Sequence, residues 1–110
     1  MSIALVLGHP SPDSFNAALA DAYEQGAVSA GAAVHRIDLH QLRFDPVLRA
    51  GYGGEQPLEP DLQTAREIID QARHVVVVFP TWWGGMPALM KGFVDRLFLP
   101  GWAFRNTPSG

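Results

Sequence analysis

Residues 75–93 read VVVVFPTWWGGMPALMKGF. The first five residues predict a strand that is β-branched almost throughout, which favours a place in the middle of a sheet. A loop of Trp and Gly follows, and Pro87 suits the first turn of a helix, where no amide proton is needed. Open α/β sheets bind ligands at the carboxyl ends of their parallel strands. We therefore expect this loop to offer flat aromatic surface to a planar cofactor.

Strand-like and helix-like segments alternate through the rest of the chain, which is typical of an α/β domain with a parallel sheet. The strands are expected at residues 3–7, 34–39 and 75–79, and the helices from Phe15 or Asn16, from Asp61 and after Pro87. In the first helix an apolar face is predicted from residues at helical spacing, namely Leu19, Tyr23, Ala27 and Ala30. Right-handed crossovers give a doubly wound sheet whose strand order begins 2-1-3.

Such a sheet leaves strand 75–79 at its edge, with an apolar row of unpaired backbone groups that invites aggregation. We therefore expect the 110 residues to be an incomplete, N-terminal part of one longer domain, or a partner to cover this edge. The connection over residues 40–60 is also long, and a connection of this length is expected to act as a lid or a subunit contact. Residues 100–110 are expected to form a loop.

Composition restricts the classes of function. Apolar residues make up 47% of the 110 residues and charged residues 17%, as in one globular domain. The net charge of −3 argues against a nucleic-acid or anionic-membrane surface. There is no cysteine, so redox chemistry has to come from a cofactor. His35, His40 and His74 are scattered and predict no metal site. The apolar start stops at Gly8, too early for a secretory signal or a membrane span, so a cytoplasmic protein is expected.

The loop over residues 8–16, GHPSPDSFN, joins the first strand to the first helix. Its hydroxyl groups, the Asn16 amide and the free amides of the helix start can hold a phosphate. An ordinary turn in which Ser14 caps the helix explains the same residues. The glycines and lysine of a Walker loop and the GxGxxG fingerprint are absent.

The second candidate loop runs from Thr81 to Gly85. Adjacent Trp residues can be core plugs, but both cannot easily point inward from one exposed turn, and a Gly pair lets the backbone approach a ligand closely. Because the two loops follow neighbouring strands, they are expected to open on one crevice, with one loop suited to phosphate and the other to a flat ring.

At these loops the chain resembles the flavodoxin-like NAD(P)H:quinone oxidoreductase family, which includes DT-diaphorase. The matching segments span nearly the whole chain: His9 with Ser14-Phe15-Asn16, Asp38-Leu39, Phe44-Asp45-Pro46, Phe79-Pro80 through Trp83, Pro87-Ala88, Lys91-Gly92, Arg96 and Phe98. The family continues for two further strands, which carry a third flavin loop and a tyrosine and histidine credited with assisting hydride transfer. This chain stops before them.

The resemblance implies a bound flavin, FAD or FMN. Its phosphate portion is expected near His9, Ser14, Phe15, Asn16 and Ala17, and its ring against Pro80, Thr81, Trp82, Trp83 and Gly84. It also implies a homodimer and a ping-pong cycle that passes two electrons from NAD(P)H to a quinone or a related nitro or azo compound.

Two other functions stay open. A flavodoxin-type electron carrier usually has a Thr-rich phosphate loop and a more acidic surface than this chain. A regulatory, flavin- or nucleotide-sensing subunit of a potassium efflux system would use the same pocket as the enzyme. The G-x-S-x-G elbow of many hydrolases is absent, so the sequence gives no indication of a hydrolase. Asp95 and Arg96 are expected on a solvated helix face, with Arg96 alternatively reaching across a dimer interface.

Overall fold

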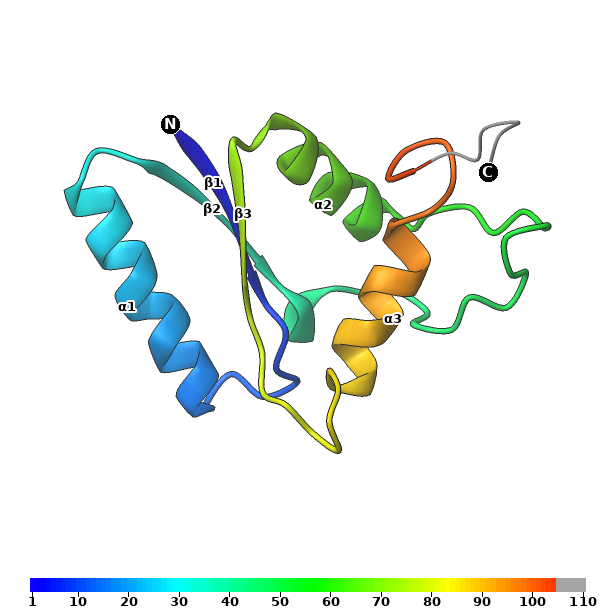
Figure 1. Cartoon of the computed structure of the whole chain (residues 1–110), viewed down its shortest axis with the longest axis horizontal. Coiled ribbons are helices and arrows are strands. Elements are labelled where there is room, and N and C mark those ends of the chain that lie inside the picture. Colours follow the sequence, from blue (N-terminus) through cyan, green and yellow to red (C-terminus); the bar gives the residue numbers. More distant parts are fainter. Residues whose placement is uncertain (105–110) are drawn as a thin grey trace.

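Three parallel strands form a sheet in the order β2-β1-β3 in the computed structural model, which describes residues 1–104. The elements are β1 (Ser2–Leu7), α1 (Phe15–Ser29), β2 (Ala33–Asp38), the short 3₁₀ helix η1 (Leu39–Gln41), α2 (Pro60–Gln71), β3 (His74–Val78) and α3 (Ala88–Leu97). Figure 1 shows α1 on one face of the sheet and α2 and α3 on the other. The predicted fold class and strand order are confirmed, and the expected loop at residues 105–110 lies outside the described part.

The core has two layers, one on each face of β1. Leu5 and Leu7 pack with Ala17 and Ala20 of α1. The other face of β1 packs against α2 and α3, and the buried residues there are Ala4, Val6, Ile37, Leu39, Leu62, Ala65, Met90, Phe93 and Leu97. This burial of β1 on both faces explains why residues 3–7 form a continuous apolar run.

Helix α1 begins as predicted but presents a different face to the sheet. Ser14 is the N-cap, and its Oγ accepts the Ala17 amide at 3.1 Å. Ala17 and Ala20 are the buried positions, whereas Leu19 and Tyr23 of the predicted apolar face stay 44% and 40% exposed. Small alanines let the helix lie close to the strands, and the larger apolar side chains stay partly exposed.

Strand β3 is an edge strand in the described part of the chain, as the predicted order 2-1-3 requires, although its sequence favours a mid-sheet position. It pairs with β1 on one side only, from Ile3 with His74 to Leu7 with Val78. Val75 and Val77 remain 45% and 39% exposed. Strand β3 therefore has the sequence of a central strand and the surroundings of an edge strand.

The connection over residues 42–59 is fastened to the core by Arg96. This arginine is 1% exposed and lies on the buried face of α3, so the expectation of a solvated position is wrong. Its Nη1 donates to the Asp45 carbonyl at 2.6 Å, and its Nη2 donates to the Pro57 carbonyl at 3.1 Å and to Glu59 Oε1 at 2.7 Å. Gly92 lets the connection approach α3, since a Cβ there would meet the Pro46 carbonyl oxygen at 2.6 Å.

Candidate functional site

Two loops leave the sheet at the same end, where the carboxyl termini of β1 and β3 lie side by side (Figure 1). The Gly8 amide, just after β1, donates to the Val78 carbonyl at the end of β3 at 2.8 Å. A Cβ on Gly8 would lie 2.6 Å from Met90 Sδ, so glycine lets the chain pass closely over α3 without displacing this side chain. The loops therefore start from one point of the sheet edge.

The first loop, residues 8–14, ends at the N-terminus of α1. The Ser11 amide donates to His9 Nδ1 at 2.9 Å, which orients the imidazole, and the Asp13 amide donates to Ser11 Oγ at 3.3 Å. The first amides of a helix have no acceptor within it, and those of Phe15 and Asn16 donate to no other described residue. Together with the helix dipole, these amides suit a bound anion such as phosphate.

The second loop closes on itself as a two-residue turn. The Trp82 amide donates to the Gly85 carbonyl at 2.8 Å, and the Gly85 amide returns a bond to the Trp82 carbonyl at 3.0 Å. Trp83 and Gly84 have φ angles of 53° and 74°, the two positive values of a type I′ turn. A bulky residue rarely adopts this conformation, and such strain is concentrated at functional sites.

The two loops contact each other through His9 and Trp82. Their ring centroids lie 5.3 Å apart with an interplanar angle of 79°, an edge-to-face arrangement. Trp82 is 45% exposed, and Trp83 is fully exposed at 105%. Neither indole is sealed in the core, and the two loops meet at one edge of the sheet, as the predicted strand order requires.

All ten residues predicted to hold a flavin therefore lie on these two converging loops or directly beside them. Phe15 is exposed, and Ala17 is buried against the sheet, where its amide is already bound by Ser14. Ser14 thus has the capping role of the simpler interpretation, and capping does not prevent its neighbours from binding an anion. The individual binding roles of the ten residues stay predictions.

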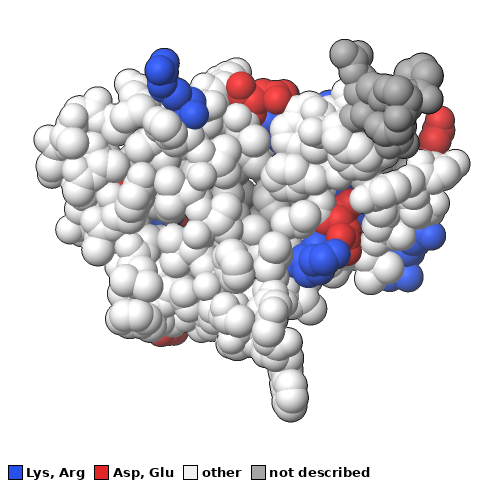
Figure 2. All heavy atoms as spheres, in the orientation of Figure 1, with Lys and Arg blue, Asp and Glu red and all other residues white. Residues whose placement is uncertain are grey.

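The second loop, residues 81–85, carries no charged side chain, and the first loop carries one carboxylate, Asp13. Figure 2 shows Lys, Arg, Asp and Glu mainly over α2, α3 and the connection 42–59, with uncharged surface around the turn 81–85. Within the connection, hydrogen bonds from the Arg96 guanidinium hold the pKa of the Glu59 carboxyl below its usual value. In residues 1–104 no three His, Cys, Asp or Glu side chains are grouped to bind a metal.

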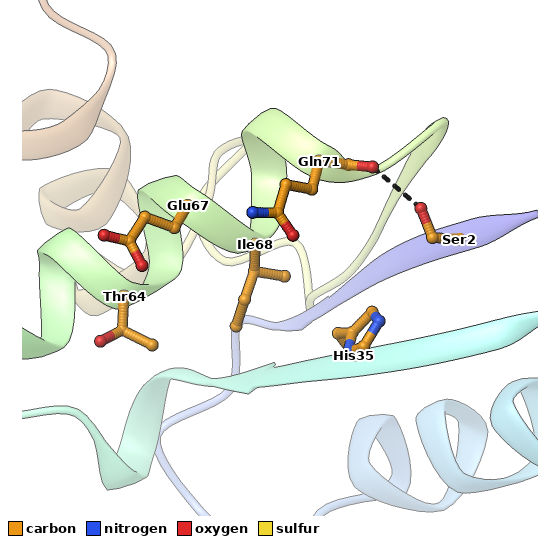
Figure 3. Close-up of a pocket in the computed structure, with 6 residues that line it drawn as sticks. All are labelled: Ser2, His35, Thr64, Glu67, Ile68 and Gln71. Carbon is orange, nitrogen blue, oxygen red and sulfur yellow. Dashed lines mark hydrogen bonds between the residues drawn. The ribbon is translucent and has the colours of Figure 1, made fainter.

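A separate hollow of about 210 Å³ lies between α2 and the amino-terminal half of the sheet (Figure 3). It is lined by Ser2, His35, Thr64, Glu67, Ile68 and Gln71, and the Ser2 hydroxyl donates to the Gln71 carbonyl at 2.9 Å. None of these residues belongs to the two loops.

Among the described residues, no helix has the length and apolarity needed to cross a membrane.

The structural roles of Gly8, beside the site, and of Arg96, beneath the connection, were not predicted from the sequence. Gly8 follows directly on a buried strand, and a glycine there is a signal of close backbone approach. Arg96 lies three residues after Phe93 and one before Leu97, both buried on α3. A lone arginine on an apolar helix face signals a buried ion pair, because an unpaired charge is rarely buried.

A parallel sheet of order 2-1-3, with two loops converging at its carboxyl edge, defines the flavodoxin-like class of α/β proteins. The chain belongs to the Flavodoxin_2 family, whose members have a flavodoxin-like fold, and the match covers residues 1–110. The resemblance inferred from the loop residues is therefore confirmed.

Known relatives are oxidoreductases by name. An uncharacterized NAD(P)H oxidoreductase of Haemophilus influenzae is 32% identical over 110 residues, which cover 96% of this chain and 54% of that protein. The structure of an NAD(P)H:quinone oxidoreductase from Methanothermobacter marburgensis is similar with a TM-score of 0.79 at 27% identity, covering 96% of this chain and 57% of the other.

An apo structure of an NADH:FMN oxidoreductase is similar with a TM-score of 0.67 at 27% identity, and the match covers 90% of this chain and 50% of the other. The chain spans about half the length of the curated relatives it matches, including the Haemophilus influenzae protein, of which it covers 54%.

Proposed function

We propose that the chain forms the phosphate- and ring-binding part of a flavin site in an NAD(P)H-dependent oxidoreductase that reduces quinones or related acceptors. The convergence of the two loops at the 5.3 Å contact between His9 and Trp82 carries this proposal. The membership of the Flavodoxin_2 family and the names of the relatives support it.

The described residues fit the two chemically different parts of a flavin. The unpaired amides of Phe15 and Asn16, with the helix dipole behind them, suit the phosphate. The Trp83 indole offers a flat apolar surface for the ring, and the amides of Trp83 and Gly84, which donate to no described residue, can stabilise electron density on it.

A bound flavin would supply the two-electron redox chemistry that couples oxidation of NAD(P)H to reduction of a quinone, with the second proton of the hydroquinone coming from water. The chain's own residues bind and orient the group. In this proposal His9, Ser14 and Asn16 hold the phosphate, and the turn 81–84 holds the ring.

Titration with riboflavin, FMN and FAD, followed by flavin fluorescence, tests the site. The wild-type protein is expected to bind FMN or FAD more tightly than riboflavin, because only the first two carry a phosphate. Ser14→Ala is expected to weaken FMN binding more than riboflavin binding. Ser29→Ala, the same change at the other end of α1, is the matched control and is expected to leave both affinities unchanged. Failure to bind any of the three at micromolar concentration would contradict the proposal.

Steady-state NAD(P)H oxidation with menadione then separates an enzyme from a sensor. Rapid turnover is expected of the oxidoreductase. Tight flavin binding with negligible turnover, and a membrane protein that co-purifies, would instead support the regulatory subunit. Mass measurement of the extracted flavin decides between FMN and FAD.

The free edge of β3 leads to a further part of the proposal. We propose that additional parallel strands of a longer domain cover this edge, because β3 pairs on one side only and the relatives are about twice as long. We also propose a homodimer. It is supported by three exposed apolar side chains: Val47 and Tyr52 in the connection, and Phe104, which follows α3 in the sequence. Light scattering is expected to show two copies, and a monomer at all concentrations would contradict the dimer.

A further inference from the structure

The two indoles at the site are adjacent in sequence but differ in their surroundings. Trp82 is 45% exposed and its ring forms an edge-to-face pair with the ring of His9, whereas Trp83 is 105% exposed and contacts no other described aromatic ring. A flat ligand can lie against Trp83 without displacing anything. The Trp82 ring already has one aromatic partner, the imidazole of His9.

Backbone hydrogen bonds fix both members of the His9–Trp82 contact. The Ser11 amide donates to His9 Nδ1 at 2.9 Å, which ties the imidazole to the first loop. The amide and carbonyl of Trp82 are both bonded to Gly85, which ties Trp82 to the second loop. The contact therefore joins two loops whose backbones are already held by hydrogen bonds. Little further conformational entropy is lost when it forms.

An edge-to-face ring pair is a favoured arrangement whose energy exceeds that of its buried area. Here the pair bridges the loop that suits phosphate and the loop that suits the ring. Holding these loops at one spacing before a ligand arrives reduces the ordering cost of binding.

We infer that His9 and Trp82 form a positioning pair that sets the spacing between the two loops, and that Trp83 alone supplies the aromatic face for the flavin ring. This inference rests on the proposed flavin site and changes the role expected for Trp82. Trp82 acts through His9 and the first loop, and so it affects the phosphate end of the ligand more than the ring end.

Comparison of FMN with riboflavin separates positioning from direct stacking. If Trp82 stacked on the ring, Trp82→Ala would weaken FMN and riboflavin by the same factor. As a positioning residue, it is expected to reduce the FMN-over-riboflavin affinity ratio by about three- to tenfold, the equilibrium equivalent of one aromatic pair. Trp83→Ala is expected to weaken both ligands equally and leave the ratio unchanged.

A double-mutant cycle tests whether the effect passes through His9. His9→Asn keeps an acceptor for the Ser11 amide and removes the ring. We compare the loss of FMN affinity caused by His9→Asn in two backgrounds, the wild type and Trp82→Ala. The loss is expected to be about three- to tenfold smaller in the Trp82→Ala background. His35→Asn, the same change on β2 away from both loops, is the matched control and is expected to change neither ligand's affinity.

The contact itself is tested without any flavin. His9→Asn is expected to change the tryptophan emission of the ligand-free protein, and this change is expected to vanish in a Trp82→Phe background. Equal loss of FMN and riboflavin in Trp82→Ala, or additive effects of the two substitutions, would overturn the positioning pair and leave the flavin site standing. A wild-type protein that binds no flavin would overturn the proposed function and the positioning role together.

Discussion

Replacement of Arg96 by Met is expected to lower the free energy of unfolding by about 3 kcal/mol. Removing one member of a buried ion pair typically costs about 3–5 kcal/mol. The carbonyls of Asp45 and Pro57 also lose their charged donor, at roughly 1 kcal/mol each. Two features reduce the total: Glu59 is 30% exposed and regains water, and Arg96 Nε has no partner among the described residues.

Urea unfolding followed by far-ultraviolet circular dichroism measures this change. Lys91→Met is the matched control, since it also removes a cation from α3. The ion pair of Lys91 with Asp95 is exposed to solvent. An exposed pair of this kind contributes about 0.5 kcal/mol or less. Trypsin provides a local readout: cleavage after Arg49, which is 69% exposed, is expected to become faster in Arg96→Met because the connection is released.

The acid dependence of stability is a second readout of the same pair. Hydrogen bonds from Arg96 lower the pKa of Glu59 in the folded state from an ordinary value of 4.5. The stabilisation is therefore complete above pH 4.5 and is lost as the pH falls through the lowered pKa. Arg96→Met is expected to remove this part of the acid dependence. The difference between the destabilisation by Arg96→Met and that by Lys91→Met decides the result. A difference below about 1 kcal/mol would refute the buried pair as the interaction that fastens the connection.

Four further substitutions test the packing, the helix cap and the turn. Gly92→Ala is expected to destabilise the protein by about 1–3 kcal/mol in urea unfolding, because the added Cβ would meet Pro46. Gly26→Ala is expected to stabilise the protein by about 0.5–1 kcal/mol, because a Cβ at this helical position meets nothing within 4 Å. Ser14→Ala is expected to cost about 1 kcal/mol through loss of the cap, and an unchanged urea midpoint would contradict the cap. Trp83→Asn is expected to raise stability by about 1 kcal/mol, since Asn tolerates a positive φ, and to weaken flavin binding; a loss of stability would show that the turn is unstrained.

Local sequence signals predicted the elements because each depends on nearby residues. The apolar run at residues 3–7, the Ser14 cap and the run of valines before Phe79 place β1, α1 and β3 within a residue or two of their observed bounds. The order 2-1-3 followed from the handedness of crossovers alone. The position of both loops at one sheet edge followed from that order.

The mistaken expectations concern side chains whose surroundings come from distant parts of the chain. Leu19 and Tyr23 have helical spacing, but the sheet that α1 covers decided that Ala17 and Ala20 are the buried residues. The sequence of β3 indicates a central strand, and its exposure depends on what lies along its free edge.

The order of residues along the chain was enough to assign the strands, helices and loops, and to bring two loops together at the carboxyl edge, because periodicity, caps and crossover handedness are local or topological properties. Three-dimensional packing was needed to show that Arg96 is buried beneath the connection, that Gly8 must be small, and that His9 meets Trp82 and leaves Trp83 free. These features depend on distances between residues far apart in the chain, which no local pattern encodes.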